Sequence, residues 1–316
     1  MPISGLHHIT AIASDPQANL DFHTGVLGLR LVKRTVNFDD PGTYHFYFGD
    51  EAGTPGTILT FFPWPGAFPG RPGSGMASAV AFSIPAGSLD FWMERFAARA
   101  LDFDGPFERL GQPGISLRDP DGLHLELIEQ SENDERLARW SAAGVPAQAA
   151  IESFHSVSLC LNGYEASARL LTETFGYETA GEEGDRFRFR SPSGAAGALA
   201  DLRCQPDRLL RGQMGAGTIH HVAFRASDPE DQLAWREKLV EQGFNVTPAL
   251  DRQYFRSIYF REPGGVLFEI ATDPPGFTLD EEIGALGAGL KLPPWLEAQR
   301  PRIEKLLPEM RLGVRA

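Results

Sequence analysis

The chain repeats one structural unit four times, and this repetition restricts its fold more than any other feature of the sequence. Each copy begins with a short apolar run that alternates or is rich in β-branched residues. A segment whose apolar residues recur every three or four positions comes next, and about three strand-like pieces separated by turns follow. The copies occupy residues 5–65, 76–130, 152–205 and 217–273. We therefore expect an α+β protein built from four βαβββ modules.

The same residue types mark the helix boundaries in several copies. An Asp-Pro pair precedes the helical segment in the first and fourth copies, as expected for an N-cap followed by proline at the first helical position. A glycine follows the helix in three copies, as a left-handed C-cap requires. These residues are Asp15, Pro16, Asp228, Pro229, Gly28, Gly176 and Gly243. The candidates for the buried helix faces are Leu20, Val26 and Leu27 in the first copy and Leu233, Trp235, Leu239 and Val240 in the fourth.

The four copies group into two domains, 1–131 and 152–273, joined by a linker at 132–151. The linker is first charged and then rich in alanine, which predicts a short helix and a crossing segment. The tail, 274–316, is punctuated by prolines and ends in the amphipathic pattern LPPWLEAQRPRIEKLLPEMR. This pattern predicts a helix docked on the outside of the protein.

Composition and charge exclude several classes of function. The 316 residues include 29 Lys and Arg against 42 Asp and Glu, for a formal net charge of −13. Nucleic acids and anionic membranes attract clustered basic residues instead. No apolar run approaches the roughly 18 residues that span a membrane, and no signal-peptide pattern is visible. Cys160 and Cys204 stand in no zinc-binding motif and are expected to be buried. The sequence thus predicts a cytoplasmic protein without nucleic-acid or membrane partners.

Two His-His pairs and one glutamate are candidates for metal ligands. His7 and His8 open the first copy, and His220 and His221 open the fourth. Glu269 lies between two apolar residues in the last strand of the fourth copy, where an unpaired carboxylate is costly to bury. Two imidazoles and one carboxylate form a facial triad of the kind that binds Fe(II). Because neighbouring strand residues point to opposite faces, one histidine of each pair should reach the metal, and the pattern does not decide which.

The repeats provide an internal control. Alignment of the copies places Ser156 where His8 stands and Ala79 where His221 stands. It places Glu126 where Glu269 stands. If the first and fourth copies surround one cavity, the second and third surround a sister cavity that binds a transition metal poorly. The remaining histidines are expected to be packing or surface residues; they are His23, His45, His124 and His155.

The chain resembles the vicinal oxygen chelate (glyoxalase/bleomycin resistance/type I extradiol dioxygenase) superfamily, and within it the bacterial hydroquinone ring-cleaving dioxygenases. The similar stretches span essentially the whole chain. They are LHHIT (6–10), VLGLRLVKRTVNFDDPGTYHFYFGDEAGTPGTILTFFPWP (26–65), IHHVAF (219–224), DRQYFRSIYFREPGG (251–265), LFEIATD (267–273) and LPPWLE (292–297). The resemblance implies two tandem glyoxalase-like domains that form cupped mixed sheets.

The resemblance also implies a function and a set of site residues. The implied enzyme cleaves the ring of a hydroquinone-type aromatic diol with O2 and uses Fe(II), with Mn(II) as the other candidate. The implied residues are His8, His221 and Glu269 as metal ligands, His7 and Thr10 as substrate contacts, and His220, Arg252 and Tyr259 as catalytic residues. His220 and Tyr259 would handle protons or orient the bound oxygens, and Arg252 would hold a developing anion. A homo-oligomer is compatible with the resemblance, and the sequence leaves the oligomeric state open.

Two other functions remain open at this point. A glyoxalase-like lyase or isomerase usually has a second carboxylate ligand, but the last strand of the first copy offers Thr60 there. A metal-free protein that binds small aromatic compounds would have no need of Glu269 beside two His pairs. Metal analysis separates the three classes, since iron favours the dioxygenase, nickel or zinc the lyase, and no metal the binding protein.

Overall fold

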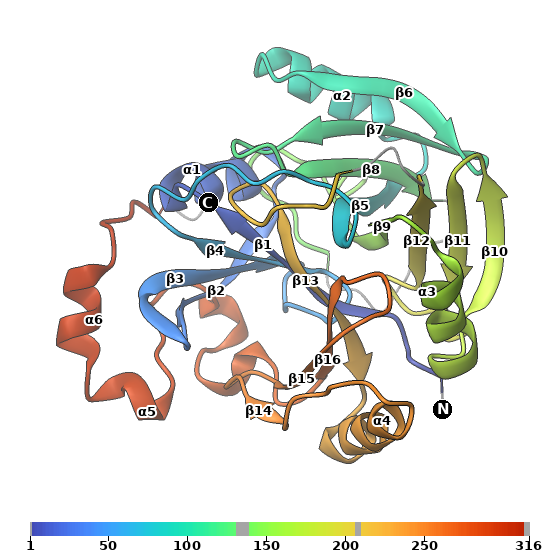
Figure 1. Cartoon of the computed structure of the whole chain (residues 1–316). Coiled ribbons are helices and arrows are strands. Elements are labelled where there is room, and N and C mark those ends of the chain that lie inside the picture. Colours follow the sequence, from blue (N-terminus) through green and yellow to red (C-terminus); the bar gives the residue numbers. More distant parts are fainter. Residues whose placement is uncertain (1, 131–138, 206–209, 313–316) are drawn as a thin grey trace.

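Two curled eight-stranded sheets form the body of the protein, with the helices on their outer sides (Figure 1). The computed structural model describes residues 2–130, 139–205 and 210–312. The first and fourth copies of the repeat share one sheet, and the second and third copies share the other. The predicted α+β class and the predicted pairing of copies are therefore confirmed.

The copies of each sheet meet through antiparallel pairing of their first strands. In spatial order, the first sheet consists of β14 (Leu250–Asp251), β15 (Arg256–Arg261), β16 (Leu267–Thr272), β13 (Ile219–Ala226), β1 (Leu6–Ala13), β4 (Ile58–Pro63), β3 (Asp40–Gly49) and β2 (Arg30–Asn37). The second consists of β10 (Glu178–Glu183), β11 (Arg186–Arg190), β12 (Leu199–Cys204), β9 (Ser153–Leu161), β5 (Met76–Pro85), β8 (His124–Gln130), β7 (Gln112–Arg118) and β6 (Phe103–Arg109). Within each copy the first strand runs parallel to the last, which requires a crossover connection between them.

One helix follows the first strand of each copy. The helices are α1 (Pro16–Asp21), α2 (Leu89–Ala98), α3 (Glu165–Arg169) and α4 (Pro229–Glu241), and π-helical turns at Phe22–Val26 and Leu170–Thr174 extend α1 and α3. The predicted caps are confirmed. Asp15 and Asp228 accept hydrogen bonds from backbone N–H groups of the first turns, and the three predicted C-cap glycines have φ values of +70°, +77° and +87°.

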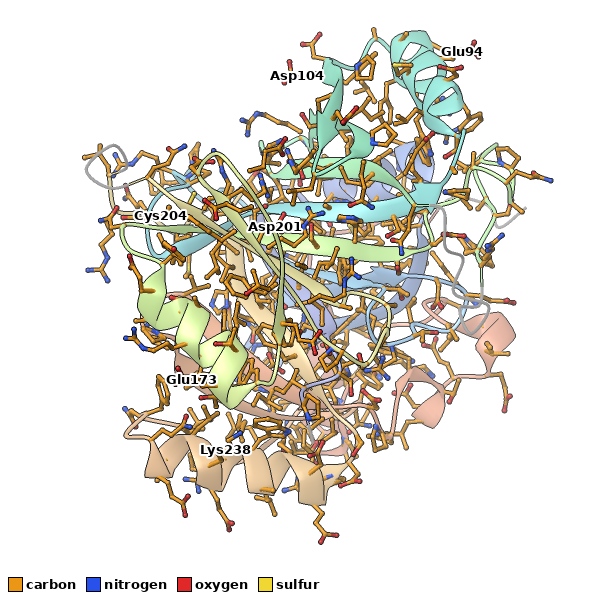
Figure 2. The ribbon with its side chains drawn as sticks, turned by 90° about the vertical axis from the view of Figure 1, so that its right-hand side faces the viewer. Glu94, Asp104, Glu173, Asp201, Cys204 and Lys238 are labelled. Carbon is orange, nitrogen blue, oxygen red and sulfur yellow. The ribbon has the colours of Figure 1, made fainter. Side chains whose placement is uncertain are left out.

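Helices of the two sheets also contact each other. Figure 2 shows α3 and its π-helical extension side by side with α4; Glu173 is labelled on the extension and Lys238 on α4. Lys238 Nζ donates to the carbonyl of Thr174 at 2.6 Å, and Thr174 Oγ1 donates to the side chain of Gln242 at 3.0 Å. The third and fourth copies are thus joined outside the sheets as well as through the chain.

The buried face of α4 differs from the predicted one. Trp235 and Leu239 are buried as predicted, but Leu233 and Val240 are 49% and 46% exposed. Gln232 takes the remaining buried position, because its amide donates to the backbone carbonyls of two strands, those of residues 256 and 270. A polar side chain with both amide hydrogens satisfied therefore completes the buried face, at a position that the prediction did not include.

The segments outside the repeats also depart from prediction. The helix predicted in the charged part of the linker falls mainly on residues 132–138, which lie outside the described residues. The tail has 3₁₀ turns η3 (Phe277–Leu279) and η4 (Ile283–Ala285) and two short helices, α5 (Pro294–Glu297) and α6 (Arg300–Leu306), in place of one helix. Pro301 explains the interruption, because it has no N–H to donate to the carbonyl four residues earlier. None of the described helices is long and apolar enough to cross a membrane.

A buried lysine attaches the tail to the first sheet. Lys33 on β2 is fully buried, and its Nζ donates to Asp280 at 2.6 Å and to Glu281 at 2.5 Å. Tyr254 donates its hydroxyl to Asp280, and its ring centre is 4.9 Å from the same Nζ. This cluster holds the tail against the loop that precedes β15.

Lys33→Met should lower the free energy of unfolding by about 3–5 kcal/mol, because it leaves two carboxylates without their buried cation. Arg300→Met is the matched control, since Arg300 pairs with Glu297 near the surface and its loss should cost about 1 kcal/mol or less. Urea denaturation of both variants measures the difference. Equal losses in the two variants would contradict the assignment of Lys33 as the attachment point.

Candidate metal centre

Three side chains from three strands converge at the centre of the first sheet. His8 on β1, His221 on β13 and Glu269 on β16 are all buried. The two Nε2 atoms are 3.3 Å apart, and Glu269 Oε2 is 3.4 Å from that of His8 and 2.9 Å from that of His221. Ligands about 2.1 Å from a divalent ion and at right angles lie about 3 Å from one another. Within residues 2–130, 139–205 and 210–312, this is the one group of at least three such side chains close enough to share an ion.

The strand register places these side chains on the same face of the sheet. Glu269 pairs with Ala223 on β13, and Ala223 pairs with His8 on β1. His221 pairs with Thr10, which is two residues from His8 and therefore on its face. Directly paired residues point to the same side of a sheet, so backbone pairing alone brings the three candidate ligands together.

A β-bulge at each His-His pair changes the expected alternation. The register shifts by one residue at His7 on β1 and at His220 on β13, so each is the extra residue of a bulge. His7 Nδ1 lies 2.9 Å from His8 Nδ1, and His220 Nδ1 lies 2.8 Å from His221 Nδ1. The first histidine of each pair therefore contacts its neighbour's ring, and strict alternation does not hold here. In each pair it is still one histidine, His8 or His221, whose Nε2 converges with Glu269.

These contacts allow the candidate ligands to present lone pairs to a cation. A ligand histidine that donates from Nδ1 has its Nε2 lone pair free for a metal. His8 and His221 can each donate from Nδ1 to the preceding histidine. Ser257 donates to Oε1 of Glu269, whose Oε2 faces the two Nε2 atoms. Two imidazole nitrogens and one carboxylate oxygen converging in this way fit a divalent transition metal.

The protonation states also suit a metal. Burial opposes the charge of Glu269, but His8 and His221 hold the pKa of its carboxyl well below the usual range. Burial lowers the pKa of His221, and burial together with His221 lowers the pKa of His220 to about 3. The glutamate is therefore ionised and these two histidines are neutral at pH 7, as metal binding requires.

A cavity of about 380 Å³ is lined by two of the candidate ligands, His8 and His221, and by the three predicted catalytic residues, Tyr259, Arg252 and His220. Tyr259 pairs directly with Glu269 in the register. Arg252 lies 5.6 Å from the ring centre of Tyr259 and 3.0 Å from the carboxylate of Asp39. Burial and the charge of Glu269 raise the pKa of Tyr259, so its hydroxyl keeps its proton.

The two predicted substrate contacts lie outside the cavity lining. His7 is buried with its ring centre 5.1 Å from that of Phe255, and Thr10 Oγ1 lies 2.9 Å from Thr60 Oγ1. Neither His7 nor Thr10 lines the cavity. The structure therefore places both on the strand that carries His8, and their role as substrate contacts stays a prediction.

Sequence reasoning missed His45 and Tyr47 on β3. Both line the cavity, although His45 was expected to be a packing or surface residue. Tyr47 pairs with Thr60, which pairs with Thr10 in the ligand strand. Only this cross-strand register reveals that they share the ligand face. His23, in contrast, is a fully buried packing residue as expected, with its ring stacked on that of Phe48.

The second sheet repeats the backbone of the centre without its ligands. Ala81 pairs with both Glu126 and Ser156. In the first sheet, Ala223 pairs in the same way with Glu269 and His8. Arg109 forms an ion pair with Glu126. Asp201, labelled in Figure 2, is fully buried and pairs with two arginines, those at 186 and 188. Guanidinium groups thus neutralise the carboxylates on the described part of this face.

Relatives of known name resemble the chain along nearly its full length. It is 49% identical over 308 residues to MhqO of Bacillus subtilis (strain 168), which is provisionally named a ring-cleaving dioxygenase, with 96% of each chain covered. It is 37% identical over 308 residues to the chlorohydroquinone/hydroquinone 1,2-dioxygenase of Sphingobium indicum, with 95% of each covered.

Solved structures and a family match extend this likeness to the fold. A crystal structure described provisionally as a dioxygenase from Bacillus subtilis matches with a TM-score of 0.94 at 47% identity, covering 98% of each chain. Glyoxalase I from Zea mays matches with a TM-score of 0.64 at 14% identity, over 85% of this chain and 92% of that one, which is a likeness of fold alone. The family described as Glyoxalase/Bleomycin resistance protein/Dioxygenase superfamily matches residues 5–127 and 153–270, in both domains. The chain therefore belongs to the glyoxalase/bleomycin resistance protein/dioxygenase superfamily.

Proposed function

We propose that this protein is an Fe(II)-dependent ring-cleaving dioxygenase that acts on a hydroquinone-type aromatic diol with O2. The observation that carries the proposal is the convergence of His8, His221 and Glu269 at the spacing of cis ligands beside a cavity. Three protein donors leave positions open on an octahedral ion. The names of the relatives at 49% and 37% identity support ring cleavage and a hydroquinone substrate.

The cavity lining suits a small aromatic diol. Phe38, Phe62, Trp64 and Phe255 supply aromatic surface around the candidate ligands, and such walls favour a flat apolar ring. Bound Fe(II) would supply Lewis acidity towards a substrate hydroxyl and electrons for the activation of O2. The polar groups of the lining would then orient the ring and its hydroxyls.

Three residues of the lining can orient the reacting oxygens and stabilise a developing negative charge. Tyr259 keeps its proton and can donate a hydrogen bond from its hydroxyl to a reacting oxygen. His220 is neutral at pH 7, and its ring centre lies 5.7 Å from that of Phe62. Because its Nδ1 accepts from His221, its Nε2 carries the hydrogen and can donate to a bound oxygen. Arg252, which is held by Asp39, can stabilise an anion that develops on the ring.

A glyoxalase-like lyase is less well supported. That chemistry usually places a second carboxylate among the ligands, and this chain has Thr60 at the corresponding place on β4. The Thr60 hydroxyl is already engaged, 2.9 Å from Thr10 Oγ1 and 2.8 Å from His45 Nε2. The ligand set is thus two histidines and one glutamate, as non-haem Fe(II) oxygenases use.

Anaerobically purified protein supplied with Fe(II) should bind iron stoichiometrically and consume O2 with hydroquinone or methylhydroquinone but not with catechol. His221→Ala should abolish iron binding and O2 uptake because it removes one of three ligands. His124→Ala, in the second sheet, is the matched control and should retain both. Metal analysis and an oxygen electrode provide the measurements. Full activity in His221→Ala would refute the ligand assignment, native zinc or nickel would favour the lyase, and absence of metal binding would favour a binding protein.

Tyr259→Phe should lower kcat by about 10²-fold or more while iron binding stays unchanged, since it removes a hydroxyl beside the reacting oxygens but no ligand. Steady-state O2 uptake and iron content measured on the same samples check this. An unchanged kcat would remove Tyr259 from the catalytic residues.

A further inference from the structure

Four polar side chains on the ligand face form a continuous chain that the proposed mechanism does not use. Thr10 Oγ1 is 2.9 Å from Thr60 Oγ1, Thr60 Oγ1 is 2.8 Å from His45 Nε2, and His45 Nδ1 is 2.9 Å from the Tyr47 hydroxyl. All four residues are buried. Only the last two line the cavity, so the chain leads from the ligand strand to the cavity wall.

The sheet order places this wall across the ligand set from Tyr259. His45 and Tyr47 lie on β3 and Tyr259 lies on β15, with β16, β13, β1 and β4 between them. Those intervening strands carry the three candidate ligands. A ring with one hydroxyl directed at the ligands can therefore direct its opposite end towards β3.

The Tyr47 hydroxyl can act as either donor or acceptor because of His45. Burial keeps the pKa of His45 well below its ordinary value, so its ring is neutral, with one N–H and one acceptor nitrogen. If Nδ1 carries the hydrogen, it donates to the Tyr47 oxygen and the phenol O–H is free to donate into the cavity. If Nε2 carries it, Tyr47 donates to Nδ1 and its oxygen can accept a hydrogen bond from a ligand.

We propose that Tyr47, positioned by His45, binds the hydroxyl of the substrate that does not face the metal ligands, and that this contact selects para-diols. In a para-diol the second hydroxyl stands at the far end of the ring, whereas in catechol the two hydroxyls are adjacent. Tyr47 is the substrate contact, and His45 is a positioning residue. The inference rests on the proposed function for the identity of the diol.

Anaerobic calorimetric titration of the iron-loaded protein with hydroquinone and with phenol tests the contact without turnover. Tyr47→Phe should weaken hydroquinone binding roughly fivefold to tenfold and leave phenol binding unchanged, because phenol lacks the second hydroxyl. Binding of catechol should also be unchanged. Tyr44→Phe is the matched control, since it removes a hydroxyl from the same strand but outside the cavity lining. The Tyr44 hydroxyl donates to the carbonyl of Pro308.

The positioning role of His45 has its own readout. His45→Leu should cause the same selective loss for hydroquinone as Tyr47→Phe, and the double variant should lose no more than either single variant, because the two residues act as one unit. His45→Gln, which can still accept from the tyrosine hydroxyl, should restore most of the affinity.

Equal losses for phenol and hydroquinone would show a merely structural role and overturn the proposal, as would no loss at all. If the wild type consumes O2 with hydroquinone while Tyr47→Phe binds both ligands normally, this inference fails and the proposed function stands. A selective loss in a protein that consumes no O2 would uphold the contact and refute the dioxygenase.

Discussion

The antiparallel pairing of β1 with β13 is the contact on which the rest of the candidate site depends. It brings together two histidines that are 213 residues apart in the chain, His8 and His221, and places their Nε2 atoms 3.3 Å apart. The same pairing joins the first copy to the fourth and completes the eight-stranded sheet. Its two bulges turn His7 and His220 against the ring of the following histidine. Backbone hydrogen bonds thus arrange the candidate ligands and their supporting residues at once.

The second sheet shows how side chains alone decide whether such a backbone can hold a metal. β5 and β9 pair in the same register, with bulges at the equivalent positions, Ser78 and His155. The equivalent carboxylate, Glu126, faces Arg109 in place of a set of imidazoles. A buried carboxylate needs a countercharge, and in this sheet an arginine provides it. The duplicated modules therefore supply two similar frameworks, of which one keeps a donor set that fits a divalent metal.

The tail, although outside the repeats, contributes to the order of the site. Lys33 holds Asp280 and Glu281, and Tyr254 bonds to the first of these carboxylates. The next residue, Phe255, lies with its ring centre 5.0 Å from that of His8. The cluster of Lys33, Asp280 and Glu281 thus holds the loop that carries Phe255. Phe255 in turn packs against the ring of His8, a candidate ligand. Rigid support of this kind is what a ligand set needs in order to hold a defined geometry.

The sequence by itself determined the modules, their caps and the candidate ligand positions, which are two His-His pairs and Glu269, because these follow from local patterns and from comparison between copies. The choice of His8 and His221 within the pairs came from the family resemblance. Asp15 and Gly28 act within a few residues of their own helix, so their roles are readable from the chain. The bulge at His7 and the cavity position of His45 were decided by the tertiary structure. Each depends on which residue of a distant or neighbouring strand lies opposite, and hydrophobic periodicity carries no record of that register.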